Sequence, residues 1–198
     1  MAEHESAIPK KKELAEKVRR ITRSFNIWKR IRLWSGYLYV VAVMLVANRF
    51  YVAAGLVLVA LGILLRGWAA GYLTKNRELS RLGPYKFVRH PLYCGSFLLG
   101  LGVTVAFTNW LFLLGYLVYF SLLYRLSVNA EEQRLHYQFD ENFSSYKQQV
   151  NGFCWPTLAL SRDDFCQWRL ELFLRNKEHR HVITFMVVLA LLVVRVHW

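Results

Sequence analysis

Hydrophobic residues along this chain gather into five runs that carry almost no charge. The runs cover residues 34–47, 50–65, 91–107, 110–128 and 182–194. A helix needs roughly 20 apolar residues to cross the hydrocarbon core of a bilayer, and the later runs approach that length, while the first is short. The pattern predicts an all-α, multi-span integral membrane protein with about five transmembrane helices.

Composition agrees with this interpretation. Of the 198 residues, 55% are hydrophobic and only 20% are charged, which leaves too small a polar shell to cover five buried runs in a soluble fold. The same composition excludes a disordered chain. The three cysteines show no zinc-ligand spacing, so no metal site is expected.

The distribution of Lys and Arg predicts the topology. Ten of them precede the first run, six lie in residues 66–89 and seven in residues 134–180, whereas the two short turns between paired runs hold only Arg49. Because such residues are retained in the cytoplasm, the N-terminus and both long loops are expected inside and the C-terminus outside. We expect a multi-pass protein of the bacterial inner membrane.

These observations divide one membrane domain into four parts. Residues 1–32 form a basic segment whose apolar positions recur at helical spacing, so it is expected to lie on the membrane surface or against the protein's own loops. Residues 33–128 form a four-span core, 129–180 a cytoplasmic region, and 181–198 the fifth span. The expected partners are the bilayer and a lipophilic ligand, with no nucleic acid and an undetermined oligomeric state.

The loop before the third span carries unusual polar chemistry. It reads Leu82-Gly83-Pro84-Tyr85-Lys86-Phe87-Val88-Arg89-His90-Pro91-Leu92-Tyr93-Cys94-Gly95. Pro84 and Pro91 bias the residues before them toward extended backbone, and Pro91 suits the first position of a helix. Arg89 and His90 could therefore line a pocket at the membrane surface, or else bind lipid phosphate and cap the helix.

Two adjacent acids follow the fourth span. Glu131 and Glu132 at a membrane exit are costly beside anionic headgroups unless they have partners, although a solvated helix start is the simpler alternative. Since charge distribution places both the acids and the Arg89-His90 loop on the cytoplasmic side, we expect them to meet in one pocket.

These motifs resemble the isoprenylcysteine carboxyl methyltransferase and phospholipid methyltransferase superfamily. The resemblance spans residues 60 to 156 and rests on the loop above, the paired glutamates, Leu135, Phe139 and Tyr146. It implies an integral membrane enzyme that uses S-adenosylmethionine to methylate a lipophilic acceptor, an isoprenylcysteine-type carboxylate or a lipid amine. It also implies that the region 129–180 closes over the cofactor. The alternatives are a sterol-reductase-like enzyme using NADPH and a non-catalytic membrane protein.

The resemblance also implies the site residues. By position, the cofactor pocket falls on Leu79, Ser80, Tyr85, His90, Pro91, Leu92, Tyr93 and Glu131. The expected catalytic residues are Arg89, His90 and Glu132: Arg89 could hold an acceptor carboxylate by a bidentate pair, while His90 or Glu132 could take the proton of an amine.

Two positions depart from the family pattern. Members with prenylcysteine activity carry an arginine four residues before the first glutamate, which is thought to meet the substrate carboxylate, but here that position is Ser127. Whether Arg125 replaces it is open. The family's His-x-Leu-Val segment appears as Arg77-Glu78-Leu79-Ser80, so contacts with adenine are expected to differ in detail.

Overall fold

The computed structural model describes residues 52–74, 78–106, 110–152 and 167–197, together with scattered positions between 16 and 38. Every regular element in these ranges is helical, and they contain no strand. The elements are α2 (Val52–Ala70), the 3-10 turn η2 (Gly83–Lys86), α3 (Pro91–Ala106), α4 (Trp110–Gln149), α6 (Leu170–Arg175) and α7 (Glu178–His197). The predicted all-α class agrees with this architecture.

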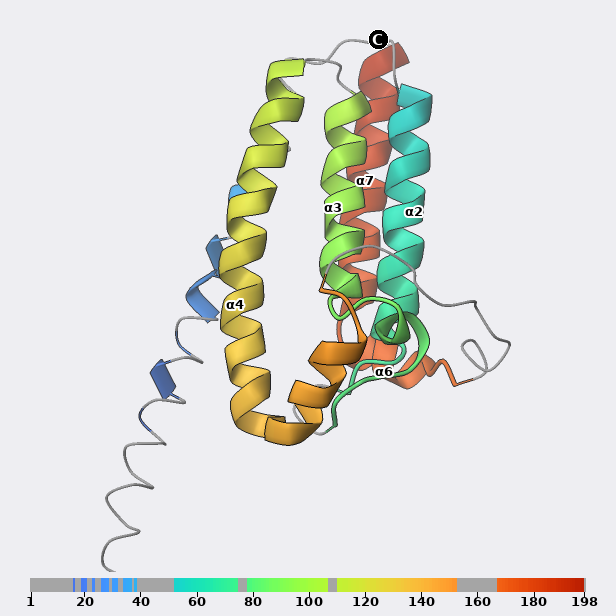
Figure 1. The fold of residues 1–198 in the computed structure, drawn as a ribbon. Coiled ribbons are helices and arrows are strands. Elements are labelled where there is room, and N and C mark those ends of the chain that lie inside the picture. Colours follow the sequence, from blue (N-terminus) through green and yellow to red (C-terminus); the bar gives the residue numbers. More distant parts are fainter. Residues whose placement is uncertain are drawn as a thin grey trace, which may run out of the picture.

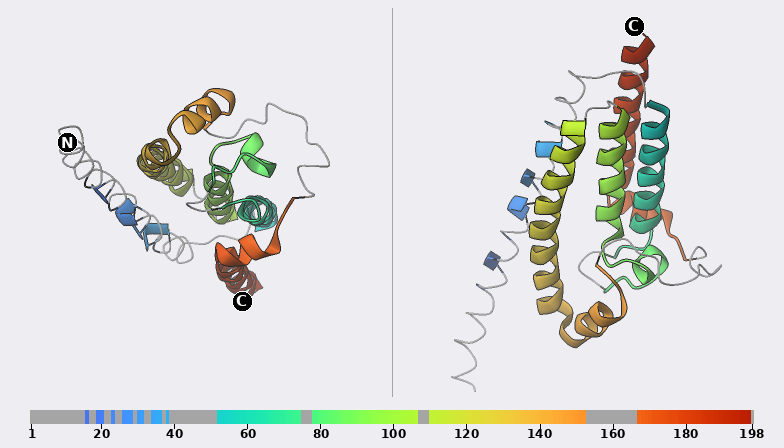
Figure 2. Two further views of the ribbon diagram at one scale, coloured as in Figure 1. Left: turned by 90° about the horizontal axis from the view of Figure 1, so that it is seen from below. Right: turned by 45° about the horizontal axis from the view of Figure 1, so that its top comes forward.

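Four long helices form the body of the molecule. Helix α3 lies between α2 and α4, and α7 packs against α2 (Figures 1 and 2). The loop containing η2, the short helix α6 and the bent end of α4 all lie at one end of this bundle, while the C-terminus lies at the other (Figure 1). The polar segments are thus collected at a single end.

The apolar runs correspond to these helices. Among the described residues, α2 and α4 are long and apolar enough to cross a membrane, and α3 is a shorter apolar helix. Helix α7 contains the last predicted run and begins three residues before the predicted boundary at 181. Most of the first run and most of the basic N-terminal segment lie outside the described residues, so the count of five spans stays a prediction.

Glycines set the close packing of α2 on α3. A Cβ added to Gly62 would lie 2.9 Å from the backbone oxygen of Gly95 and 2.9 Å from Leu99. Gly55, seven residues before Gly62 on α2, faces Gly102 on α3 in the same way. Small residues let two helix backbones approach in a bilayer, where dispersion contacts rather than hydrophobic burial hold helices together. This pairing fixes the end of α3 that carries His90.

Replacing Gly62 by alanine should therefore destabilise the protein. The added methyl group meets backbone atoms, and overpacking of this kind costs about 1–3 kcal/mol. Thermal unfolding in detergent micelles measures the loss. Gly115→Ala is the matched control, because no heavy atom lies within 4 Å of its added Cβ. An equal effect of both substitutions would contradict tight packing at Gly62.

Helix α4 reverses direction near its C-terminal end. Asp140 has a φ of 38° and a ψ of −111°, which divides the continuous helix into two parts. The second part folds back so that Phe143, Tyr146 and Val150 form a buried cluster, against which Leu79, Leu135 and Phe139 pack. The reversal brings residues near 147 back toward the acidic pair at 131–132.

A buried ion pair attaches α7 to α2. Arg66 donates from Nε and Nη2 to the Glu178 carboxylate at 2.7–3.1 Å, and its Nη1 donates to Ser96 Oγ on α3 at 2.6 Å. Asn176 donates to the carbonyl oxygens of Ala70 and Leu73, which closes the end of α2. Lys177, with a φ of 59°, separates α6 from α7.

Candidate functional site

The loop from Gly83 to Pro91 is held on both sides. Gly83 has a φ of 58°, a conformation that suits glycine, and Pro84 follows it at the start of η2. The Tyr146 hydroxyl donates to the carbonyl oxygen of Tyr85 at 2.6 Å, and the Arg89 amide donates to Asn151 at 2.9 Å. The returning part of α4 therefore fixes the backbone that presents Arg89 and His90.

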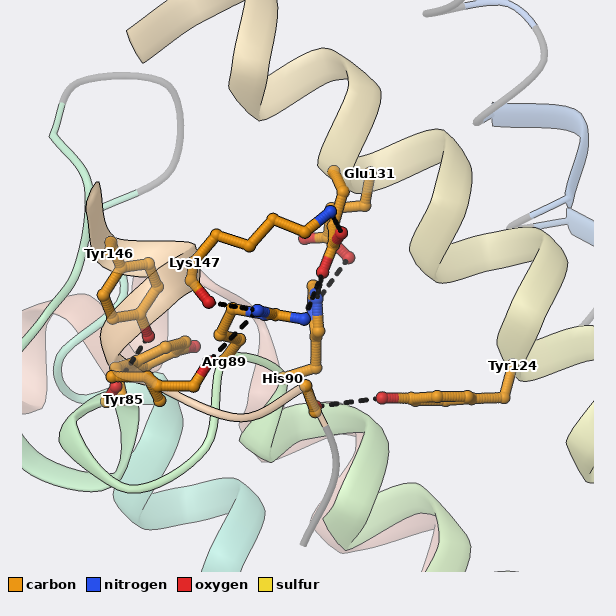
Figure 3. A network of polar contacts seen from close by, with 10 residues as sticks. Tyr85, Arg89, His90, Tyr124, Glu131, Tyr146 and Lys147 are labelled. Carbon is orange, nitrogen blue, oxygen red and sulfur yellow. Dashed lines mark hydrogen bonds and ion pairs between the residues drawn. The ribbon is translucent and has the colours of Figure 1, made fainter. Parts of the chain in front are cut away.

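Glu132 is the centre of a polar network with Arg89, His90 and Lys147, the three residues labelled together in Figure 3. Its Oε1 lies 3.1 Å from Arg89 Nη2 and 3.2 Å from His90 Nε2, and its Oε2 lies 2.7 Å from Lys147 Nζ. The carboxylate is mostly buried, with 11% of its side chain exposed. The predicted meeting of the Arg89-His90 loop with the acidic pair is therefore present, at one end of the bundle.

The network keeps Glu132 ionised. Burial raises the pKa of this carboxyl, but hydrogen bonds from His90 and Lys147, together with the charge of Arg89, outweigh it and lower the pKa to about 2. An ionised Oε1 accepts, so His90 Nε2 carries a hydrogen and its Nδ1 keeps a lone pair when the ring is neutral. Glu132 is thus a weak base that orients His90.

The Arg89 side chain contacts Glu132 and the returning end of α4. Its Nη2 pairs with the carboxylate, and its Nη1 donates to the carbonyl oxygens of Lys147 and Val150 at 2.8 and 3.1 Å. Only Nε has no hydrogen-bond partner among the described residues. Each terminal nitrogen thus has a partner, while Nε is left to donate to a ligand.

Aromatic rings complete the site on the membrane side. The Tyr93 ring contacts His90 and Tyr124 edge-on, each with centroids 5.8 Å apart. Tyr124 also donates to the carbonyl oxygen of Gly152 at 3.0 Å, which ties α4 to the segment after it.

Glu131, the other member of the acidic pair, is less closely held than Glu132. Glu131 Oε2 lies 3.9 Å from His90 Nδ1, too far for a hydrogen bond, and 32% of the Glu131 side chain is exposed.

The other predicted cofactor residues lie in different surroundings. Pro91 is buried at the first position of α3, and the Leu92 carbonyl oxygen accepts from Arg66 and Ser96. Ser80 donates to the Tyr72 carbonyl oxygen, and both Ser80 and Leu79 line an open pocket of about 480 Å³. Arg81, Trp168 and Arg169 also line that pocket, whereas His90, Tyr93 and Glu131 do not. The predicted set therefore divides into two groups.

Three buried polar side-chain atoms on the loop and on α4 lack a hydrogen-bond partner among the described residues. They are Tyr85 Oη, Arg89 Nε and Ser127 Oγ. Buried polar groups are nearly always hydrogen-bonded, so each such atom calls for an explanation. Burial raises the pKa of the Tyr85 hydroxyl well above its usual value, so this group stays protonated and can donate or accept. These atoms suit a polar ligand.

Some members of the site were missed by sequence reasoning. Lys147 is fifteen residues from Glu132 along the chain, and only the reversal at Asp140 brings its ammonium group to the carboxylate. Tyr124 carried no signal beyond its place in an apolar run. Arg125 is exposed while Ser127 is buried, so the two side chains occupy different faces of α4. The described residues contain no group of three or more His, Cys, Asp or Glu that could hold a metal ion.

Apolar helices with a histidine, an arginine and paired acids at one end define a membrane protein with an enzyme-like site. A family model for the isoprenylcysteine carboxyl methyltransferase (ICMT) family matches residues 56–137, which include the loop, all of α3 and the part of α4 that carries the acidic pair. The chain belongs to this family, and membership suggests methyl transfer as its class of activity.

Two relatives extend the comparison beyond the matched segment. The nickel-cobalt-cadmium resistance protein NccN of Alcaligenes xylosoxydans xylosoxydans is 32% identical over 156 residues, covering 71% of each chain. The cobalt-zinc-cadmium resistance protein CzcN of Cupriavidus metallidurans is 36% identical over 115 residues, covering 56% of this chain and 51% of its own length. No solved structure matches the chain.

Proposed function

We propose that this protein transfers a methyl group from S-adenosylmethionine to a lipophilic acceptor at the cytoplasmic face of the membrane. The observation that carries the proposal is the convergence of Arg89, His90 and Lys147 on Glu132 at the bundle end where α3 and α4 leave the apolar region. Family membership supplies the reaction class.

The residues present fit the cofactor. Tyr85 Oη and Arg89 Nε are buried groups without partners, which suit the hydroxyl, carboxylate and ring-nitrogen atoms of a nucleoside amino acid. The Tyr93 ring offers an aromatic face that favours a positive sulfonium, and Glu131 has the exposure to accept from hydroxyl or amino groups. When bound, the cofactor supplies an electrophilic methyl group.

The protein's contribution is alignment and exclusion of water. An in-line displacement needs donor and acceptor held close together, and a buried, pre-arranged site provides this. Glu132 and Lys147 keep His90 in one orientation, and Tyr124 ties α4 to the segment at Gly152. We propose that the acceptor's apolar tail lies between α3 and α4, where Phe97 and Phe120 meet with centroids 4.9 Å apart.

Calorimetric titration of the detergent-purified protein with S-adenosylhomocysteine tests the cofactor assignment. Saturable heat is expected for the wild type, with affinity reduced at least about tenfold by His90→Ala and by Tyr93→Ala, a loss of about 1.4 kcal/mol or more. His136→Ala is the control, because His136 is exposed on the outer part of α4. No heat with this ligand, together with saturable heat for NADPH, would instead support the reductase alternative.

The names of the relatives suggest a cellular setting. Both are named for resistance to divalent heavy metals. We propose that nickel, cobalt or cadmium stress is the condition in which the methyl transfer matters to the cell. Complementing a deletion strain with the wild type should restore growth in cadmium, whereas His90→Ala should not, and equal growth of both strains would contradict a role for the site.

A further inference from the structure

The open pocket beside the end of α2 is separate from the Glu132 network. Its volume of about 480 Å³ lies within the range of sites that hold small molecules. The loop that follows α2 forms one wall, and residues 167–169, just before α6, form the other. Neither Arg89 nor His90 lines this pocket. The chain therefore offers a second place for a ligand.

Direct contacts hold the two walls of this pocket together. The Arg169 amide donates to the carbonyl oxygen of Gly71 at 3.1 Å, and Trp168 Nε1 donates to that of Gly67 at 3.1 Å. A Cβ added to Gly71 would lie only 2.0 Å from Trp168 Nε1, so the indole ring lies directly on this glycine. The shape of the pocket is therefore set by the fold.

Two arginines give the pocket a positive charge. Arg81 lines one wall and Arg169 the other, against a single acid, Glu78. Arg81 donates to the carbonyl oxygen of Asn142, which carries no charge, and the Arg169 side chain makes no hydrogen bond or ion pair with a described residue. Guanidinium groups bind phosphate oxygens through pairs of N–H groups. The pocket therefore suits an anionic ligand that contains phosphate.

Exposed apolar side chains adjoin this basic pocket. Trp168 is exposed at its edge, and Leu170 and Leu174 are exposed one helical turn apart on α6. Helix α2, which is apolar and long enough to cross a membrane, ends at Ala70, where the pocket begins. Lipid headgroups surround a spanning helix at this level, and tryptophan is enriched there. The pocket is thus placed to meet lipid.

We infer that this pocket binds the headgroup of an anionic phospholipid. The two arginines take the phosphodiester oxygens, and Glu78 accepts from the hydroxyl groups of a glycerol headgroup. A water-soluble phosphate would gain the same arginine contacts but would leave Trp168, Leu170 and Leu174 exposed, whereas a lipid covers them. The inference does not depend on the proposed methyl transfer.

Binding at this pocket should stabilise the nearby end of the bundle. The Arg81 guanidinium lies 5.7 Å from the centroid of the Tyr146 ring, and the Tyr146 hydroxyl donates to the carbonyl oxygen of Tyr85, on the loop that presents His90. Arg81 therefore joins the pocket to the returning part of α4. Because a ligand that binds only the native state stabilises that state, the lipid should raise the unfolding temperature.

Titration of the full-length protein in detergent micelles with phosphatidylglycerol tests the inference. The unfolding temperature is followed against lipid concentration to obtain the affinity. Phosphatidylcholine is the comparison lipid, because it has the same phosphodiester but adds a positive charge to the headgroup. Phosphatidylglycerol is expected to bind at least about fivefold more tightly, the effect of roughly one basic residue acting on an anionic lipid.

Substitution of single arginines locates the binding. Arg169→Gln removes one cation without breaking a side-chain contact to a described residue, and should weaken phosphatidylglycerol binding about fivefold. Arg175→Gln is the matched control, because it removes the same charge from an exposed position on α6 outside the pocket and should leave the affinity unchanged. Arg81→Gln should also weaken binding, and its unfolding temperature without lipid measures the loss of the contact with Asn142.

Three results would overturn the inference. An equal loss of affinity in Arg169→Gln and Arg175→Gln would indicate diffuse attraction to a basic surface. Binding of glycerol 3-phosphate as tight as that of phosphatidylglycerol would indicate a site for a soluble phosphate. Binding of S-adenosylhomocysteine that is weakened by Arg169→Gln would assign the pocket, with Leu79 and Ser80, to the cofactor.

Discussion

Replacing Glu178 by alanine is expected to cause the largest loss of stability of any single substitution in the described part of the chain. Glu178 is only 4% exposed, and its carboxylate receives three hydrogen bonds from Arg66. Its removal leaves the Arg66 guanidinium buried without a matching charge. Breaking a buried pair by removing one partner costs about 3–5 kcal/mol.

Thermal unfolding in detergent measures this effect. For a chain of this length, each 1 kcal/mol lowers the unfolding temperature by roughly 2–4 °C, so Glu178→Ala should lower it by roughly 10 °C. Glu171→Ala is the matched control, because Glu171 is exposed in the first turn of the neighbouring helix α6. If both variants unfolded at the same temperature, the ion pair would not hold α7 in place.

A double variant separates the charge from the packing. Arg66→Met combined with Glu178→Leu removes both charges and replaces them with apolar volume, a change that is often neutral or stabilising for buried pairs. Most of the lost stability should return. A double variant as unstable as Glu178→Ala would show that the hydrogen bonds from Arg66 to Ser96 and Leu92 matter more than the pair itself.

Much of the bundle could be predicted because apolar length is a local property. The runs at 91–107 and 110–128 correspond to α3 and the first part of α4, and the charge distribution predicts that Arg89 and Glu132 lie on the same side of the membrane. Their contact follows, since two segments that leave adjacent helices at the same end must lie close together.

Contacts that depend on chain reversal could not be predicted in this way. Lys147 reaches Glu132 only because Asp140 adopts a positive φ. No glycine or proline stands at that position to indicate a bend in the sequence. Arg66 and Glu178 are 112 residues apart, and each alone is an ordinary charged residue at a helix end. Leu79 packs against the cluster of Phe143 and Tyr146 and lines a pocket that Tyr93 does not reach, an arrangement that spacing along the chain does not encode.

Replacing Glu132 by glutamine should have the largest effect on the site. Three donors converge on its two oxygens, from Arg89, His90 and Lys147. Whichever way the amide is turned, its NH2 group faces at least one of these donors, and the charge that balances the cations is lost. We expect His90 to lose its fixed orientation and the affinity for S-adenosylhomocysteine to fall at least about tenfold. Glu141→Gln, exposed beyond the bend in α4, is the control.

Acid should remove the same interaction from the wild-type protein. Since the pKa of Glu132 falls from its ordinary value of 4.5 to about 2 on folding, its ionised form stabilises the native state fully above pH 4.5, and this contribution is lost as the pH falls toward 2. The difference in unfolding temperature between wild type and Glu132→Gln should therefore be constant from pH 7 to about 4.5 and shrink below it. A difference that stays constant down to pH 2 would mean that Glu132 is not the ionised centre of the network.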